Sequence, residues 1–136
     1  MKSKKSPLES AFHFLSFRSR SEKEMLDFLI KKDFETDEIA QTVLKLKELD
    51  FINDAKFDKE FIESRSKNKP KGKKALMIEL ARKGIKIENI EIDEKELATK
   101  AISRKSFKSK EQMQRFLYSR GFSWDTIIGI IGSHER

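Results

Sequence analysis

The stretch SEKEMLDFLIKKDF (residues 21–34) recurs 88 positions later as SKEQMQRFLYSRGF (residues 109–122), and this internal repeat decides the fold. The corresponding positions are Ser21 and Ser109, Met25 and Met113, Phe28 and Phe116, Leu29 and Leu117, and Phe34 and Phe122. Both stretches open with a serine followed three residues later by Glu or Gln, the capping-box pattern, and continue with apolar residues at helical spacing. The sequence therefore predicts helical modules that recur along the chain.

A third copy lies between these two. Leu80 and Ile90 come 51 positions after Leu29 and Ile39 and 37 positions before Leu117 and Ile127. In that register three turns correspond, with aspartate in place of glycine in the first: Lys32-Asp33-Phe34, Lys83-Gly84-Ile85 and Arg120-Gly121-Phe122. The segment 85–92 partly alternates with period two, which alone is also compatible with a short strand pair. The repeat register instead predicts that Ile90 belongs to a short helix.

We therefore predict an all-α fold of three tandem three-helix-bundle repeats in an elongated, curved array. The expected modules are residues 8–52, 53–93 and 94–136. The chain has 136 residues, about the length of one ordinary domain, and only five glycines and two prolines, fewer than turn-rich β-proteins need. Each module is too small to be stable alone and is expected to bury part of its apolar stripe against a neighbour.

The composition argues against a catalytic, membrane or disulfide-bonded protein. Cysteine is absent, which removes disulfides, thiolate nucleophiles and cysteine-based zinc sites. The basic start, Met1–Ser6, is not followed by the apolar run of a signal peptide, and no segment is long and apolar enough to span a bilayer. His13 and His134 lie in unrelated repeats, and neither a phosphate-binding glycine motif nor an enclosed carboxylate pair is evident. We expect a soluble, cytoplasmic, monomeric protein without catalytic residues, metal or cofactor.

The net charge of +7 favours polyanionic partners, and one stretch concentrates it. Residues 65–74 contain six cations and no acid: Arg65, Lys67, Lys69, Lys71, Lys73 and Lys74. A phosphate backbone or an acidic groove would supply the missing counter-charge. Further cations at the corresponding edges of the first and third modules suggest a basic ridge: Arg18, Arg20, Arg104, Lys105 and Lys108. The alternative is a solvated linker with scattered surface lysines.

Eleven phenylalanines raise the question of base stacking. Most recur at helical spacing on apolar faces, so we expect them in the core. Phe17 and the single tryptophan, Trp124, lie near helix boundaries and are expected to be partly exposed.

Five segments resemble the RecX family, which is built from three tandem three-helix modules. They are Arg18–Glu22, Leu49–Phe57, Ser64-Arg65, Gly72–Leu80 running into Arg82–Ile85, and Arg120–Trp124, and together they cover nearly the whole chain. Asp50, Asn53 and Asp58 depart from the family's usual glycine, aspartate and alanine. Aspartate tolerates a left-handed backbone better than most residues, so Asp50 can still make the turn.

The resemblance implies a non-enzymatic regulator of recombination, DNA repair and the SOS response. Its expected partner is the RecA filament on DNA, bound along the groove or at an end, with inhibition of ATP hydrolysis and strand exchange. The alternative from the residues alone is a helix-turn-helix-like DNA-binding regulator that acts without RecA.

Overall fold

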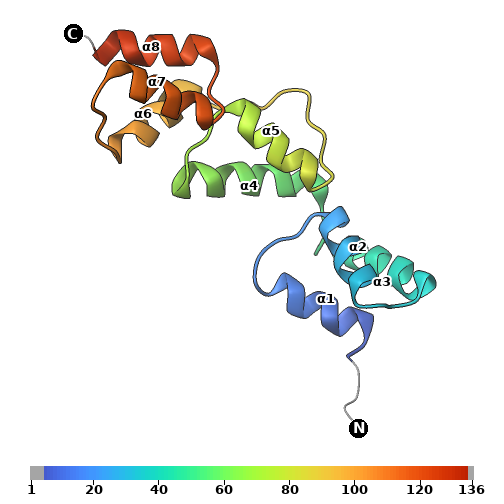
Figure 1. Ribbon diagram of the computed structural model, residues 1–136. Coiled ribbons are helices and arrows are strands. Elements are labelled where there is room, and N and C mark those ends of the chain that lie inside the picture. The colour runs from blue at the N-terminus through green and yellow to red at the C-terminus, as the bar shows by residue number, and fades with distance from the viewer. Residues whose placement is uncertain (1–4, 135–136) are drawn as a thin grey trace. The chain divides into compact units, whose positions relative to one another are not determined.

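The protein is all-helical in the computed structural model, which describes residues 5–134 (Figure 1). Within that range the helices are α1 (Pro7–Leu15), α2 (Glu22–Lys31), α3 (Thr36–Glu48), α4 (Asp54–Asn68), α5 (Lys73–Arg82), α6 (Glu94–Ser103), α7 (Lys110–Ser119) and α8 (Trp124–His134). No strand occurs between residues 5 and 134, which confirms the predicted all-α class. The basic start noted above lies largely outside the described residues.

The chain divides into two compact units, and the division falls within α4. The first unit comprises the residues up to Lys59 together with the turn Lys83–Ile85. The second comprises Glu60–Arg82 and the residues from Lys86 onward.

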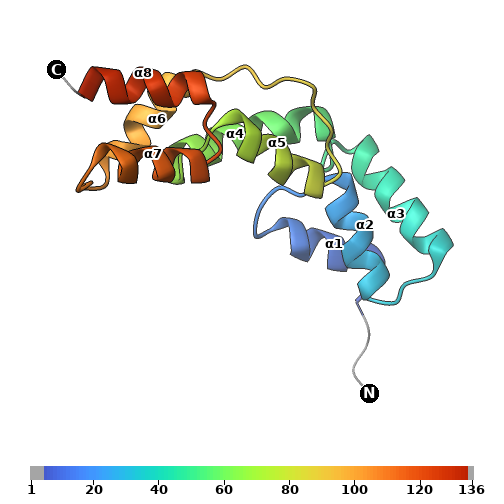
Figure 2. The same cartoon turned by 45° about the horizontal axis from the view of Figure 1, so that its top comes forward.

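The first unit is a bundle of α1, α2 and α3 (Figure 2). Its core contains one apolar stripe from each helix: Ala11, Met25, Leu29, Ile39, Val43 and Leu46. The predicted capping box begins α2, since Ser21 Oγ accepts from the Glu24 amide (3.2 Å) and Glu24 Oε1 accepts from the Ser21 amide (3.1 Å). Both contacts satisfy amides that have no partner within the helix.

The second unit contains the bundle of α6, α7 and α8, with the C-terminal part of α4 and all of α5. Its main core is again a set of helical stripes: Leu97, Ala98, Ala101, Ile102, Leu117, Phe122, Ile127 and Ile130. Ser109 begins α7 by accepting from the Gln112 amide (3.1 Å), but Gln112 Oε1 accepts from the Lys108 amide (2.6 Å) rather than from Ser109. The predicted second capping box is therefore only half formed.

The three turns that the repeat aligned share one backbone conformation. Asp33, Gly84 and Gly121 have φ of 67°, 82° and 82°. Each turn thus ends a helix with a residue in the left-handed region. Asp50 adopts the same conformation, φ 63°, as predicted for its turn.

The short helix predicted around Ile90 is wrong. Residues 83–93 contain no helical residue, and the segment follows an irregular path from α5 to α6. Asp93 already caps α6 by accepting from the Glu96 amide (3.1 Å), which leaves too few residues after Gly84 for a stable helix. The β-branched isoleucines that mark the register are still buried, as Ile85 and Ile90 show.

The phenylalanines are mostly at least half-buried, as expected, with three exceptions. Phe12, Phe17 and Phe51 are exposed, and Phe12 and Phe51 contact each other edge to face, with ring centroids 5.1 Å apart. Trp124 is 53% exposed, which confirms the prediction for it and for Phe17.

Two sets of contacts recur along the chain. The residue before α2, Ser21, donates its hydroxyl to the Lys83 carbonyl (2.7 Å), and Gly72, 51 positions later, donates its amide to the Arg120 carbonyl (2.9 Å). In the second set, the backbone amide of a helix's first residue donates to a carboxylate. Asp54 accepts from the Glu22 amide (2.9 Å), and Glu94 accepts from the Lys73 amide (2.7 Å).

In the first set, the residue before one module's second helix contacts the turn that follows the second helix of the next module. In the second set, the first residue of that second helix contacts the first residue of the next module's leading helix. The modules, residues 8–52, 53–93 and 94–136, stay a proposal, and within the described residues the middle one has two helices instead of the three that were predicted.

Candidate anion-binding surface

The C-terminus of α4 is contacted by two cations from the C-terminal end of α6. The Arg104 guanidinium donates to the Lys67 and Asn68 carbonyls, at 2.9 Å each, and the Lys100 ammonium donates to the Ser66 carbonyl (2.9 Å). These carbonyls have no partner within the helix, and the helix dipole favours positive charge at this end. The predicted linker cations and Arg104 are therefore brought together in the second unit, partly for a structural reason.

Two of the predicted binding residues share one glutamate as their ion-pair partner. Arg65 Nε donates to Glu79 Oε2 (3.0 Å), and the Lys71 ammonium is bonded to Glu79 Oε1. Burial raises the pKa of Glu79, but the hydrogen bond from Lys71 and the charge of Arg65 outweigh it, so the pKa of Glu79 is lowered. Arg65 and Lys71 therefore hold α4, the following loop and α5 together, and half of their positive charge is compensated by Glu79.

The exposed cations of the run are Lys67, Lys69 and Lys74. Lys67 lies 3.3 Å from Glu63, but both side chains are about 70% exposed, and such pairs contribute little. Lys69 and Lys74 form no ion pair with any residue between 5 and 134. Lys73 is half-buried, and its amide is one of the donors to Glu94. Of the predicted run, these three exposed lysines are the ones open to an external anion.

Of the predicted cations that follow α6, Lys105 lies beside an aromatic ring. The Lys105 ammonium lies 4.7 Å from the centroid of Phe116, a half-buried ring that also contacts Phe107. Lys105 and Lys108 are exposed, and Lys108 uses its amide at the start of α7. Lys105 follows Arg104 directly, so the surface around the end of α4 continues to Lys105.

Arg18 and Arg20 belong to the first unit and are engaged there. Arg20 donates to the Phe14 carbonyl through Nε (3.3 Å) and Nη2 (3.2 Å), and its guanidinium lies 3.6 Å from the centroid of the Phe14 ring. That ring stacks on Phe28, with centroids 4.0 Å apart. Arg18 forms a two-bond ion pair with Glu24. Both arginines thus order the segment between α1 and α2.

The ion pair of Glu24 makes the stability of the first unit dependent on pH. Burial raises the pKa of Glu24, but hydrogen bonds from Arg18 and the Ser21 amide, with the nearby charges of Arg18 and Lys83, lower it to about 2. Because the folded pKa is below the unfolded one, this stabilisation is complete above about pH 4.5 and is lost as the pH falls toward 2.

We expect Glu24→Gln to cost about 1–3 kcal/mol at pH 7 and much less at pH 3. Urea denaturation followed by circular dichroism at both pH values measures the difference. Asp27→Asn on the same helix is the control, because Asp27 forms only an exposed pair with Lys23. An equal loss at both pH values would contradict the assignment.

Three residues that are important for this surface were not predicted from the sequence: Glu79, Glu94 and Lys100. Glu79 and Glu94 resemble ordinary exposed helix acids, and only the packing reveals their partners. The four-residue spacing of Lys100 and Arg104 places both on one face of α6 and is the one available signal.

The arrangement defines a helical repeat protein with an exposed cationic surface. Within residues 5–134 no three His, Asp or Glu side chains are grouped as a metal site requires, and no helix is both long and apolar enough to cross a membrane.

Comparison with known proteins gives the family. Residues 8–46 match the first three-helix domain of RecX, and residues 53–92 match the second. The Regulatory protein RecX of Chlorobium limicola is 34% identical over 131 residues, covering 86% of this chain and 82% of that protein. The chain belongs to the RecX family of regulatory proteins, as the resemblance indicated.

Other relatives are longer, and the solved structures agree on the fold. The Regulatory protein RecX of Oceanobacillus iheyensis is 34% identical over 135 residues, which is 88% of this chain but 50% of that protein. The chain thus spans about half the length of several curated relatives. The crystal structure of RecX from Lactobacillus salivarius has 25% sequence identity and a TM-score of 0.71, with 93% of both chains covered.

Proposed function

We propose that this protein binds the RecA filament on DNA, in its groove or at its end, and inhibits RecA ATP hydrolysis and strand exchange. In this role it acts in the cytoplasm as a monomeric, non-catalytic regulator of recombination, DNA repair and the SOS response. Family membership supports the target. The exposed cations beside the end of α4 are the observation that supports the mode of binding.

Charge and exposure select the residues that make this contact. Lys67, Lys69, Lys74 and Lys105 are exposed, and the carbonyl-bound Arg104 fixes α6 against the end of α4. Each contact with a phosphate or an acidic side chain releases bound counterions, which makes affinity dependent on salt. Arg65 and Lys71 contribute through Glu79 by fixing the loop. Arg18, Arg20, Lys73 and Lys108 are proposed as weaker contributors.

The direct test measures DNA-stimulated ATP hydrolysis by the cognate RecA with increasing amounts of this protein at several salt concentrations. We expect the triple variant Lys67→Gln, Lys69→Gln, Lys74→Gln to inhibit less well and to show a shallower salt dependence. If all three lysines contact phosphate, the slope of log affinity against log salt falls by about 3.

A matched control removes the same charge elsewhere. Lys31, Lys45 and Lys59 are exposed lysines of α2, α3 and α4, and their replacement by glutamine should leave the salt slope nearly unchanged. Equal effects of both triple variants would show a non-specific charge effect. Absence of inhibition by the parent protein, together with sequence-selective duplex binding, would favour the helix-turn-helix-like regulator instead.

A further inference from the structure

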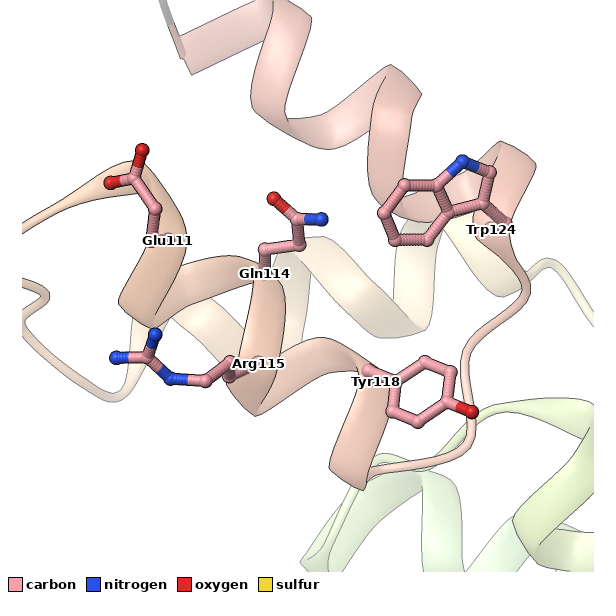
Figure 3. Close-up of a pocket in the computed structure, with 5 residues that line it drawn as sticks. All are labelled: Glu111, Gln114, Arg115, Tyr118 and Trp124. Carbon is pink, nitrogen blue, oxygen red and sulfur yellow. The ribbon is translucent and has the colours of Figure 1, made fainter.

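The outer face of the third module has the features that the preceding modules use to bind their successors. A depression of about 340 Å³ on this face is lined by Glu111, Gln114, Arg115, Tyr118 and Trp124 (Figure 3). The first four side chains come from α7 and the last from the start of α8. Tyr118 is 66% exposed and Trp124 53%, an unusual amount of uncovered aromatic surface.

The same face of the second module lines a cavity shared with its neighbour, although Lys74 and Ile78 on this face stay exposed. Lys74, Met77 and Ile78 on α5 lie 37 positions before Glu111, Gln114 and Arg115. They line a larger cavity whose other wall is formed by the third module, including Gly121, Phe122 and Ser123. The α7 face is therefore the counterpart of a face that lies beside the next module.

The two existing interfaces define the chemistry of the occupant. In each, a carboxylate from the first residue of the incoming module's leading helix binds the start of the preceding module's second helix, as Asp54 and Glu94 do. In each interface, the turn after the second helix of the incoming module contains a glycine. A Cβ on Gly84 would lie 2.7 Å from Lys23 Cβ, and one on Gly121 would lie 2.5 Å from Ala75 Cβ.

These requirements argue against a second copy of this chain. The first module has Pro7, not an acid, at the first position of its leading helix. It has Asp33 in the turn, where both interfaces need glycine. The first module therefore lacks both the carboxylate and the glycine that the two interfaces use.

We propose that the α7–α8 face docks a further helical module of the same repeat type, which begins with a carboxylate and has glycine in its second turn. The start of α7 suits that carboxylate, since Lys108 and Lys110 flank the N-cap Ser109 and the helix dipole adds positive potential. Several relatives are about twice the length covered by this chain, which gives them room for such modules. This inference does not depend on the proposed function.

The test extends the full chain with its own second module and the four residues that precede it. Appending residues 49–93 after Arg136 places the copied Asp54 at position 142, 88 positions after the original, so the repeat register continues. Trp124 is the only tryptophan, and the appended residues contain neither Trp nor Tyr, so fluorescence reports the docking face directly. We expect a blue shift of Trp124 emission, weaker acrylamide quenching and additional helical circular dichroism.

Two matched variants of the extended chain separate docking from a general effect. Ala in place of the copied Asp54, or Val in place of the copied Gly84, should reverse the blue shift. The same appended residues in scrambled order should give the parent spectrum. Because a module needs a neighbour to fold, an appended module that stays unfolded or leaves Trp124 exposed would overturn the proposal. Dimerisation of the parent chain with burial of Trp124 would also overturn it, in favour of a second copy.

Discussion

Gly121→Ala is expected to lower the free energy of unfolding of the second unit by about 3 kcal/mol. A residue other than glycine in the left-handed region costs about 1–2 kcal/mol, and Gly121 has φ 82°. The added Cβ would also lie 2.5 Å from Ala75 Cβ and 2.6 Å from the Ala75 backbone nitrogen. Relieving such overpacking costs a further 1–3 kcal/mol, roughly, because backbone must move. Urea denaturation followed by Trp124 fluorescence measures the loss.

Gly129→Ala is the matched control for this prediction. Gly129 lies within α8, and nothing is within 4 Å of a Cβ built there. Alanine is favoured over glycine inside a helix by about 0.5–1 kcal/mol, so this variant should be slightly more stable than the parent. If the two variants behave alike, the contact between the Gly121 turn and the start of α5 does not exist in solution.

The repeat allowed the turns and most helices to be predicted because their determinants are local. A serine cap followed by apolar residues at helical spacing specifies a helix start without any distant contact. The equivalence of Asp33, Gly84 and Gly121 was likewise readable, and the structure explains the substitution. Only the second and third turns pack against a preceding module, so only they exclude a Cβ.

The segment 83–93 shows where this reasoning fails. The register of Ile90 matched that of Ile39 and Ile127, which lie in true helices. A conserved apolar position within the repeat reports burial, however, and an extended segment can bury an isoleucine as well as a helix can. The early cap of α6 at Asp93 decided between them.

The binding surface was only partly predictable because charge patterns do not reveal pairing. The six cations of residues 65–74 were expected to act together, but Glu79, 14 positions after Arg65 and 8 after Lys71, pairs with both of them. The contact of Arg104 with the end of α4 spans more than 35 positions and depends on tertiary packing. Sequence therefore located the charge, and the fold determined which charges stay exposed.

Glu94→Ala is expected to destabilise the second unit by about 3 kcal/mol, because one buried carboxylate joins the starts of two helices. Glu94 is 8% exposed. Its Oε2 accepts from the Lys73 amide (2.7 Å), and its Oε1 accepts from the Ser123 amide (3.1 Å) and the Thr126 hydroxyl (2.7 Å). Removing the carboxylate takes this acceptor from the Lys73 and Ser123 amides, at a cost of about 1–3 kcal/mol for each that stays dry, whereas the Thr126 hydroxyl can still bond Ser123 Oγ (2.9 Å).

The pH dependence distinguishes the carboxylate from its mere bulk. Burial raises the pKa of Glu94, but the hydrogen bonds from Lys73, Thr126 and Ser123 outweigh it and lower that pKa. The stabilisation is therefore complete above the unfolded pKa of about 4.5 and is lost as the pH falls through the folded pKa. Glu94→Gln, which replaces one acceptor oxygen with a donor, should cost about 1–2 kcal/mol at pH 7 and less in acid.

Glu96→Gln controls for the loss of a negative charge near the start of α6. Glu96 is in the same first turn, but its side chain is exposed, so its replacement should change stability by less than about 0.5 kcal/mol. Equal losses for the two glutamine variants would mean that the helix dipole, not the link between helix starts, accounts for the effect of Glu94. Since Glu94 and Asp54 occupy equivalent positions, a large loss specific to Glu94 would identify the acidic first residue as the contact on which each module interface depends.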